Sequence, residues 1–365
     1  MAGLQPPKPS TRPARLARRA ATAGFRVRDA AICHHRRSDP APGCLQPGGR
    51  AVGVSVSCIV ALRDEGGMAG PALAALLAQT QPAQDIVVIL DGADAATAQA
   101  ADAIRDPRIR VVERSRDGLS SAFNHGVELA RGDWLTFQTG HDLRPAHALA
   151  ALAAQGERAD LVLAPVVREG ETPAAEFAAL DALLPEGGAI AAGDTAFARA
   201  LGAAAALPLA PAGLMIRRET ARGLRFPDGV CFGEVFLHLA ALARAGRVAL
   251  MPGAAALRPR HLYTARSEPM DGIAILSLAL EALAGEPRLQ HGAFRTGCVA
   301  RLMRLLGACA ARLGPVARRE FLQVAGAVVA AAPPLWDALP EDGGGLCPPA
   351  AMARFLAMRH GGSAA

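Results

Sequence analysis

The sequence predicts an α/β fold with a mainly parallel sheet flanked by helices, followed by a helical C-terminal region. Two observations support this prediction. From residue 54 onward, short apolar runs alternate with longer stretches of helical period, which is typical of successive β and α elements. The segments between the runs are mostly long enough for the crossovers that parallel strands need.

Five apolar runs are the expected strands, with helical stretches between most of them. They span residues 54–62, 85–90, 108–113, 134–137 and 160–164. A parallel α/β sheet binds its ligands outside the carboxyl ends of its strands. We therefore look for chemistry in the loops that follow residues 62, 90 and 137.

The net charge of +6 is concentrated at the start of the chain. Residues 1–53 hold ten basic and two acidic side chains, so they carry +8 and the other 312 residues carry −2. A slightly acidic body with two Trp and one Tyr predicts neither a phosphate-tracking stripe nor a set of base-stacking platforms. We expect no nucleic-acid partner.

The basic tail is rich in Pro, Arg and Ala and lacks a sustained hydrophobic period, so we expect residues 1–53 to be disordered. Two interpretations stay open. The tail is either a basic arm that touches anionic lipid headgroups, giving peripheral membrane association, or an over-extended start, with translation beginning near residue 54.

Hydropathy and cysteine usage bear on location. The longest uncharged stretch, 66–84, is interrupted by Pro71 and Pro82 and falls short of the roughly 20 apolar residues of a membrane-spanning helix. No apolar core of a signal peptide follows the early arginines. The seven cysteines never occur as C-x-x-C. We expect no transmembrane segment and a cytoplasmic location, with the inner face of the membrane as the alternative.

Four segments occur in an order that points to a known family. They read V-S-V-S-C-I-V-A-L-R-D-E at 54–65, L-A-A-L-L-A-Q-T-Q-P at 73–82, D-I-V-V-I-L-D-G-A-D at 85–94 and G-L-S-S-A-F-N-H-G-V-E-L-A-R-G-D-W-L-T-F at 118–137. Together they resemble the family 2 glycosyltransferases. The resemblance covers residues 54–267 and implies the GT-A fold, a Rossmann-like fold of nucleotide-diphospho-sugar transferases.

The resemblance places donor-binding groups at the ends of the first two strands. Asp64 and Asp91 suit the ribose and the base, because a carboxylate accepts hydrogen bonds from a hydroxyl or a pyrimidine N–H. The alternative for Asp91 is a simple strand-ending turn with Gly92. Leu90 stands where the family has an acidic residue, so the resemblance does not identify the nucleotide.

Asn124 is the third candidate for donor binding. It lies in a predicted helix over residues 119–130, where Asn has no propensity advantage, so we expect a contact to substrate or to a neighbouring loop. A satisfied structural Asn is the equal alternative.

The loop after the fourth strand departs from the family's Asp-x-Asp metal motif. Thr139 and His141 occupy the two Asp positions, and Asp142 follows. The resemblance puts Thr139 beside the donor nucleotide and makes His141 and Asp142 candidate metal ligands, for which manganese suits an imidazole and a carboxylate better than magnesium. Altered use of a divalent cation, metal independence and loss of catalysis all remain open.

The segment 223–242 resembles the family's Phe-Pro-x-Gly stretch followed by acidic residues at the start of a helix. Inverting transfer needs one carboxylate to take the proton of the acceptor hydroxyl, and Glu234 is the candidate. The alternative is a helix N-terminal acid that complements the helix dipole.

Residues 256–267 resemble the basic segment that closes over the diphosphate. Arg258 and Arg260 are candidates for diphosphate binding, and His261 is a further candidate metal ligand. A solvated basic loop is the alternative. Beyond residue 267, apolar stripes over 273–283 and 298–313 predict helices.

The expected organisation is therefore a tail (1–53), a GT-A domain (54–267) and a helical region (268–365). The expected function is inverting transfer of a sugar from UDP or another nucleoside diphosphate to a glycan or lipid-linked acceptor, in making a cell-surface polysaccharide. The alternative is a catalytically inactive nucleotide-sugar-binding homologue. A dinucleotide-dependent oxidoreductase is disfavoured because no G-x-G-x-x-G follows the first strand.

Overall fold

The computed structural model describes residues 54–186, 188–251, 253–259 and 268–331. From residue 54 onward the chain forms one compact unit. The tail for which disorder is predicted lies outside the described residues. The boundary expected between residues 267 and 268 stays a prediction.

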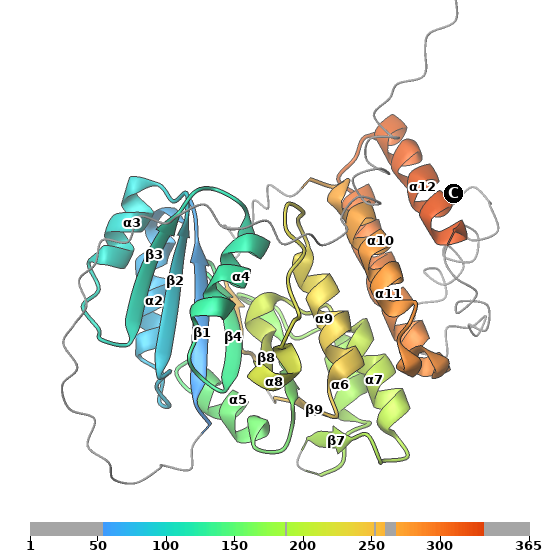
Figure 1. The fold of residues 1–365 in the computed structure, drawn as a ribbon, viewed down its shortest axis with the longest axis horizontal. Coiled ribbons are helices and arrows are strands. Elements are labelled where there is room, and N and C mark those ends of the chain that lie inside the picture. The colour runs from blue at the N-terminus through green and yellow to red at the C-terminus, as the bar shows by residue number, and fades with distance from the viewer. Residues whose placement is uncertain (1–53, 187, 252, 260–267, 332–365) are drawn as a thin grey trace, which may run out of the picture. The chain divides into compact units, whose positions relative to one another are not determined.

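A twisted eight-stranded sheet organises this unit, in the order β3-β2-β1-β4-β8-β5-β9-β7 (Figure 1). Strands β1 to β4 are parallel to one another, β8 runs antiparallel between β4 and β5, and β7 runs antiparallel to β9. The strands are β1 Val56–Leu62, β2 Asp85–Asp91, β3 Ile109–Arg114, β4 Trp134–Thr139, β5 Leu161–Leu163, β7 Ala189–Ala191, β8 Leu214–Arg217 and β9 Arg247–Leu250. The predicted mainly parallel α/β sheet is confirmed.

A second, two-stranded sheet lies beside the end of β4. It pairs β6 (Val166–Arg168) in parallel with β10 (Ala256–Arg258). Leu257 also forms an antiparallel bridge with Leu143, in the turn after β4, through two backbone hydrogen bonds of 2.8 and 2.9 Å. This bridge ties β10 to the residue that directly follows the candidate metal motif.

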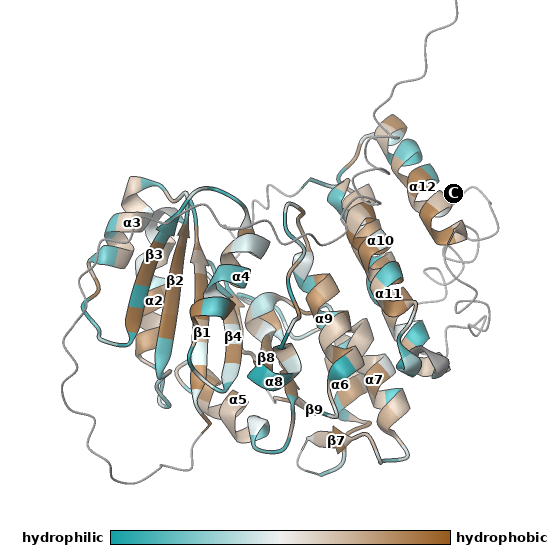
Figure 2. Cartoon of the chain, in the orientation of Figure 1, coloured by the Kyte–Doolittle hydropathy of each residue, from teal (hydrophilic) through white to brown (hydrophobic). Residues whose placement is uncertain are grey.

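Both faces of the sheet are buried, and β1 shows how its residues divide between them. Ile59 and Ala61 belong to one hydrophobic cluster, whereas Cys58, Val60 and Leu62 belong to the other. This alternation is the period of a strand, and burial on both sides explains why the strands read as continuous apolar runs. Figure 2 shows the same strands coloured hydrophobic along most of their length.

Helices cover the two faces. The second cluster includes helices α2 (Ala69–Leu77), α3 (Ala95–Asp102) and α5 (Ala148–Gly156). The first includes α4 (Leu119–Leu129) and α9 (Gly233–Arg244). The others are α6 Ala175–Asp181, α7 Phe197–Ala206, α8 Arg218–Ala221, α10 Asp271–Leu283, α11 Gly292–Ala310 and α12 Pro315–Ala330, with 3₁₀ turns η1 Gly66–Met68, η2 Pro211–Gly213 and η4 Pro287–Gln290.

The C-terminal helices continue the core of the sheet domain. Ile275 of α10, Phe294 of α11 and Phe321 of α12 are fully buried and belong to the same cluster as α4 and α9. The helices predicted from the apolar stripes over 273–283 and 298–313 are confirmed as α10 and α11. Within the described part of the chain, no helix has both the length and the apolar character needed to cross a membrane.

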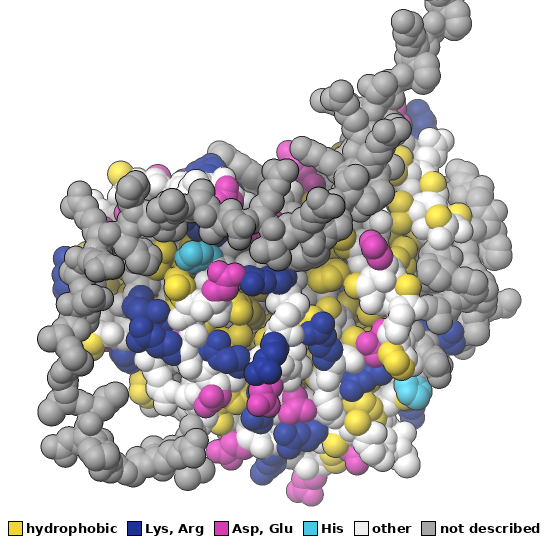
Figure 3. Space-filling model, viewed as in Figure 1, with side chains coloured by type: hydrophobic (Ala, Val, Ile, Leu, Met, Phe, Trp, Pro, Cys, Tyr) yellow, Lys and Arg dark blue, Asp and Glu magenta, His cyan; other side chains and the backbone are white. Residues whose placement is uncertain are grey.

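The surface carries both signs of charge. On the face drawn in Figure 3, dark blue basic side chains lie interspersed with magenta acidic ones. Ion pairs at the surface of the described residues include Arg247 with Asp160 and Arg225 with Glu128. Alternation of sign is typical of a solvated protein surface rather than of a surface that follows a phosphate backbone.

The contact between α7 and α11 depends on one glycine. A Cβ on Gly297 would lie 2.0 Å from the carbonyl oxygen of Gly202. We expect Gly297→Ala to lower the free energy of unfolding by about 1–3 kcal/mol, because two backbones would have to separate. Urea unfolding of the full chain measures this change.

Gly307 of the same helix is the matched control, because a Cβ there meets no atom within 4 Å. Gly307→Ala should leave stability unchanged or raise it by about 0.5–1 kcal/mol, the helix-propensity gain of alanine over glycine. Equal effects at the two positions would contradict the close approach of α7 and α11.

Candidate functional site

The ends of three neighbouring strands form the candidate site. In the parallel register Leu62 of β1 pairs with Leu90 of β2, and Ala61 pairs with Thr139 of β4. Residues 63–65, Asp91 and the turn after Thr139 therefore lie along one edge. Strand β1 has β2 on one side and β4 on the other, which is the kind of crevice where open α/β sheets bind ligands.

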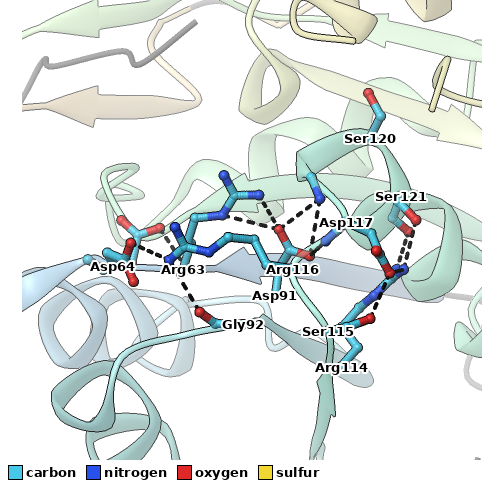
Figure 4. Close-up of polar contacts among 12 residues, drawn as sticks. Arg63, Asp64, Asp91, Gly92, Arg114, Ser115, Arg116, Asp117, Ser120 and Ser121 are labelled. Atoms are coloured by element: carbon cyan, nitrogen blue, oxygen red, sulfur yellow. Dashed lines mark hydrogen bonds and ion pairs between the residues drawn. The ribbon is translucent and has the colours of Figure 1, made fainter. Parts of the chain in front are cut away.

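Asp91 joins two strands to the start of a helix. Its carboxylate accepts hydrogen bonds from both Nε and Nη2 of Arg63, and from the backbone N–H groups of Asp117 and Gly118 at 2.9 and 3.1 Å (Figure 4). The side chain is almost fully buried. Gly118 precedes α4 with φ of 103°, a conformation that favours glycine. Asp91 thereby sets where α4 begins.

Asp64 lies on the more exposed side of the same edge. Its carboxylate accepts a 2.5 Å hydrogen bond from Arg116, whose guanidinium also reaches the carbonyl of Gly92 at 3.3 Å (Figure 4). Both side chains of this ion pair remain partly exposed. The roles expected for Asp64 and Asp91 in nucleoside binding stay predictions.

Asn124, in the second turn of α4, clamps a loop from the second half of the chain. Its Nδ2 donates to the carbonyl of Phe226 at 2.8 Å and to Oδ1 of Asp228 at 3.1 Å, and its Oδ1 accepts from the N–H of Phe226 at 2.9 Å. Of the contacts expected for Asn124, the structure shows the one to a neighbouring loop. Contact with the donor stays a prediction.

The loop that Asn124 holds leads directly into α9. Phe232 has φ of 65°, the only positive φ at a non-glycine position among the described residues. Gly233 follows, and a Cβ there would lie 2.5 Å from Oγ of Ser120 in the first turn of α4. Helices α4 and α9 therefore begin side by side, and Glu234 stands in the first turn of α9.

Burial controls the acidity of Glu234. It raises the pKa of the carboxyl above its ordinary value, while the positive charges of Arg301 and Arg258 oppose the shift. Arg301 is a buried residue of α11 that donates to the carbonyl of Leu209 at 3.1 Å. One turn along α9, burial lowers the pKa of His238 to about 3, so this imidazole is neutral. Burial and the charges of two arginines thus act on the pKa of Glu234 in opposite directions, a combination often found at functional sites.

Thr139, Asp142 and Arg258 form a closed group beyond β4. The Nε of Arg258 donates to Oδ1 of Asp142 at 2.7 Å, and Oδ2 accepts from the N–H and the hydroxyl of Thr139, each at 2.8 Å. Asp142 is fully buried. Burial acts to raise its pKa, but Arg258 and Thr139 outweigh burial and hold the pKa below its ordinary value.

His141 contacts a carboxylate from β1's end. Its Nε2 lies 3.2 Å from Oε2 of Glu65. Gly140 permits this approach, since a Cβ there would lie 2.6 Å from the Glu65 carboxyl carbon. Burial raises the pKa of Glu65, although His141 and the backbone N–H of Arg63 oppose the rise.

These contacts bear on the metal expectation. Both oxygens of Asp142 already accept hydrogen bonds, so in this arrangement a cation could reach the carboxylate only by displacing a partner, and His141 faces Glu65. The metal-binding roles expected for His141 and Asp142 stay predictions. No group of three His, Cys, Asp or Glu side chains with metal-holding geometry occurs among the residues whose placement is described. Arg260 and His261 lie outside those residues.

The sequence pattern did not indicate three residues of this site, Arg63, Glu65 and Arg116. The strand register contains a signal for the first of them. Since Leu62 pairs with Leu90, the residues that follow, Arg63 and Asp91, have to be neighbours. An arginine and an aspartate at equal offsets beyond two parallel strands therefore predict an ion pair.

Comparisons with known proteins agree with this architecture. Residues 57–189 match the family model described as "Glycosyl transferase family 2". Two curated relatives come from Bacillus subtilis (strain 168). "Uncharacterized glycosyltransferase EpsJ" is 41% identical over 69 residues, 18% of this chain and 20% of the relative. "Putative glycosyltransferase EpsH" is 29% identical over 120 residues, 32% of this chain and 35% of the relative. The matches thus span between a fifth and about a third of these relatives.

A solved structure resembles most of the chain. The S. aureus TarS fragment 1–349, in complex with UDP-GlcNAc, superposes with a TM-score of 0.63 at 15% identity, covering 84% of this chain and 90% of that one. The same fragment in complex with UDP gives 0.60 at 14% identity. These likenesses establish the GT-A fold of this chain.

The clamp made by Asn124 is open to test. Asn124→Asp would set a carboxylate oxygen against the carbonyl of Phe226 and the carboxylate of Asp228, so we expect it to lower the unfolding free energy by about 1–3 kcal/mol. Denaturant unfolding of the full chain measures the loss.

Asp228→Asn, added to Asn124→Asp, supplies an amide donor to the new carboxylate and should recover part of the lost stability. A single variant as stable as the parent chain, or a double variant no better than the single one, would contradict the clamp.

Proposed function

We propose that this chain, whose residues 57–189 belong to glycosyl transferase family 2, transfers a sugar from a nucleoside diphosphate to a hydroxyl acceptor with inversion. The observation that carries the proposal is the junction of α4 and α9. Asp91 fixes the first turn of α4 and Gly233 packs on that turn, which brings Glu234 to the edge of the sheet where Asp64 and Asp91 lie.

In the proposed reaction Glu234 is the general base. Its carboxylate takes the proton of the acceptor hydroxyl as that oxygen attacks the anomeric carbon. The bond from the anomeric carbon to the diphosphate oxygen breaks on the opposite side, and its electron pair leaves with the diphosphate. A raised pKa suits this role, since a stronger base accepts the proton more readily near neutral pH.

The donor is proposed by chemical class. The TarS fragment was solved in complex with UDP-GlcNAc. We propose that the donor of this chain is likewise a nucleotide sugar, linked to UDP or to another nucleoside diphosphate. Asp64 and Asp91 are the proposed base and ribose contacts, with Asn124 and Thr139 as supports of the same pocket. Arg258, with Arg260, is proposed to face the diphosphate. The proposed acceptor is a growing glycan or a lipid-linked saccharide of a cell-surface polysaccharide.

One observation favours a second candidate. The carboxylate that follows β4 is closed off by Arg258 and Thr139. An inactive homologue that binds a nucleotide sugar without transferring it would tolerate that closure. The two candidates differ in whether a bound donor turns over.

Turnover of the donor tests the proposal. The full chain is incubated with UDP-, GDP- and CDP-sugars, and release of the nucleoside diphosphate is followed with and without oligosaccharide acceptors. We expect Glu234→Gln to slow release by about 10²–10⁴-fold, the usual contribution of a general base, while nucleotide affinity stays unchanged. Glu281→Gln, at an exposed position of α10, is the matched control.

The pH dependence gives a second readout. Because the pKa of Glu234 is raised, the base is ionised above that pKa and the rate is lost as pH falls through it. We expect the acidic limb of kcat/KM to lie above the ordinary glutamate value of about 4.3. The limb should disappear in Glu234→Gln. Nucleotide binding without turnover at any pH would favour the inactive homologue, and no binding would exclude both candidates.

A further inference from the structure

The buried ion pair beyond β4 occupies the position at which a divalent cation was expected. Arg258 and Thr139 together give three hydrogen bonds to Asp142, and these use both carboxylate oxygens. The carboxylate has no exposed surface. A cation could bind Asp142 only by displacing Arg258 or Thr139, and it would then lie beside a guanidinium of the same sign.

The neighbouring imidazole is also engaged. His141 lies within ion-pair distance of Glu65, and the glycine between Thr139 and His141 lets the Glu65 side chain fill the adjacent space. The charge of Asp142 is therefore balanced by the guanidinium of Arg258, and Glu65 lies against the imidazole of His141. A divalent ion is usually held by several oxygen or nitrogen ligands, and no group of three His, Cys, Asp or Glu side chains placed to hold one occurs among the described residues.

The backbone holds Arg258 in place. Its strand pairs with β6, and the residue before it bridges Leu143 on the far side of the turn. The guanidinium is thus fixed at the carboxyl end of β4 independently of any ligand. Its positive charge also opposes the rise in the pKa of Glu234. Fixed, preorganised charges are effective at stabilising a leaving anion.

We propose that Arg258, held by Asp142, takes the place of a divalent cation, so that this chain binds nucleoside diphosphates without a metal. This inference rests on the proposed function and names how its donor site compensates the diphosphate charge. Asp142 is a positioning residue in this arrangement. Arg258 supplies the cation.

Calorimetric titration of the full chain with UDP, GDP and CDP, in EDTA and in saturating MnCl₂, tests the proposal. We expect the nucleotide that binds to have the same dissociation constant in both media. Arg258→Met should weaken binding of that nucleotide by about ten- to a hundredfold in EDTA, because one charge-assisted contact is lost. Binding of the corresponding nucleoside, which lacks phosphates, should not change.

Arg247→Met is the matched control. Arg247 also forms an arginine–aspartate pair, with Asp160 at 2.9 Å, but it stands at the start of β9, at the opposite end of the parallel strands. Its loss should leave nucleotide affinity unchanged. Arg258→Lys keeps a positive charge beside Asp142 and tests the proposal if the Met variant misfolds. We expect it to bind the nucleotide with intermediate affinity and without a requirement for manganese.

Manganese binding to the parent chain is a readout that needs no variant. Without nucleotide, electron paramagnetic resonance should show only free Mn²⁺. With nucleotide and an excess of Mn²⁺, the free-ion signal should equal that of a control that contains the same nucleotide and Mn²⁺ but no protein. Manganese-dependent nucleotide affinity, or an affinity unaffected by Arg258→Met, would overturn the inference but would not contradict the proposed transferase function. Absence of nucleotide binding in every medium would instead overturn the proposed function, and the inference with it.

Discussion

The carboxylate of Asp91 is the interaction on which the arrangement of the site depends. It is buried at the end of β2 and receives Arg63 from β1 and two backbone N–H groups from the turn before α4. A buried carboxylate has to be compensated, and here the compensation also joins two strands and a helix. Because α4 in turn supports Ser120 and Asn124, the loop 226–228 and the start of α9 are located through the same carboxylate.

Charge compensation follows one pattern along the sheet edge. Arg63 compensates Asp91 and Arg258 compensates Asp142, while the imidazole of His141 faces Glu65. For Asp142 the compensation prevails, and the pKa of the carboxyl falls below its ordinary value. For Glu234 burial prevails, and the pKa rises. Along this edge an arginine therefore lowers the pKa of Asp142, whereas burial raises the pKa of both Glu65 and Glu234.

The helical C-terminal region takes part in this balance. Helix α11 crosses α7 so closely that only glycine fits at residue 297, and the same helix carries Arg301 into the interior near Glu234. The helices also extend the hydrophobic cluster of the sheet. The region is thereby continuous with the candidate site in packing and in charge.

The sequence by itself determined the parallel half of the sheet, helix α4 and the C-terminal helices α10 and α11, because long apolar runs and helical stripes are set by local period. It also located Asp64, Asp91 and Thr139 at or just beyond strand ends, Glu234 at the start of a helix and Asn124 within a helix. Strands β6 to β10 were not predicted, since three or four residues are too few to show a period. Only the tertiary structure decided what each carboxylate contacts. Arg258 and Asp142 are separated by 116 residues, and their pairing follows from the bridge between Leu257 and Leu143, a contact that no local pattern encodes.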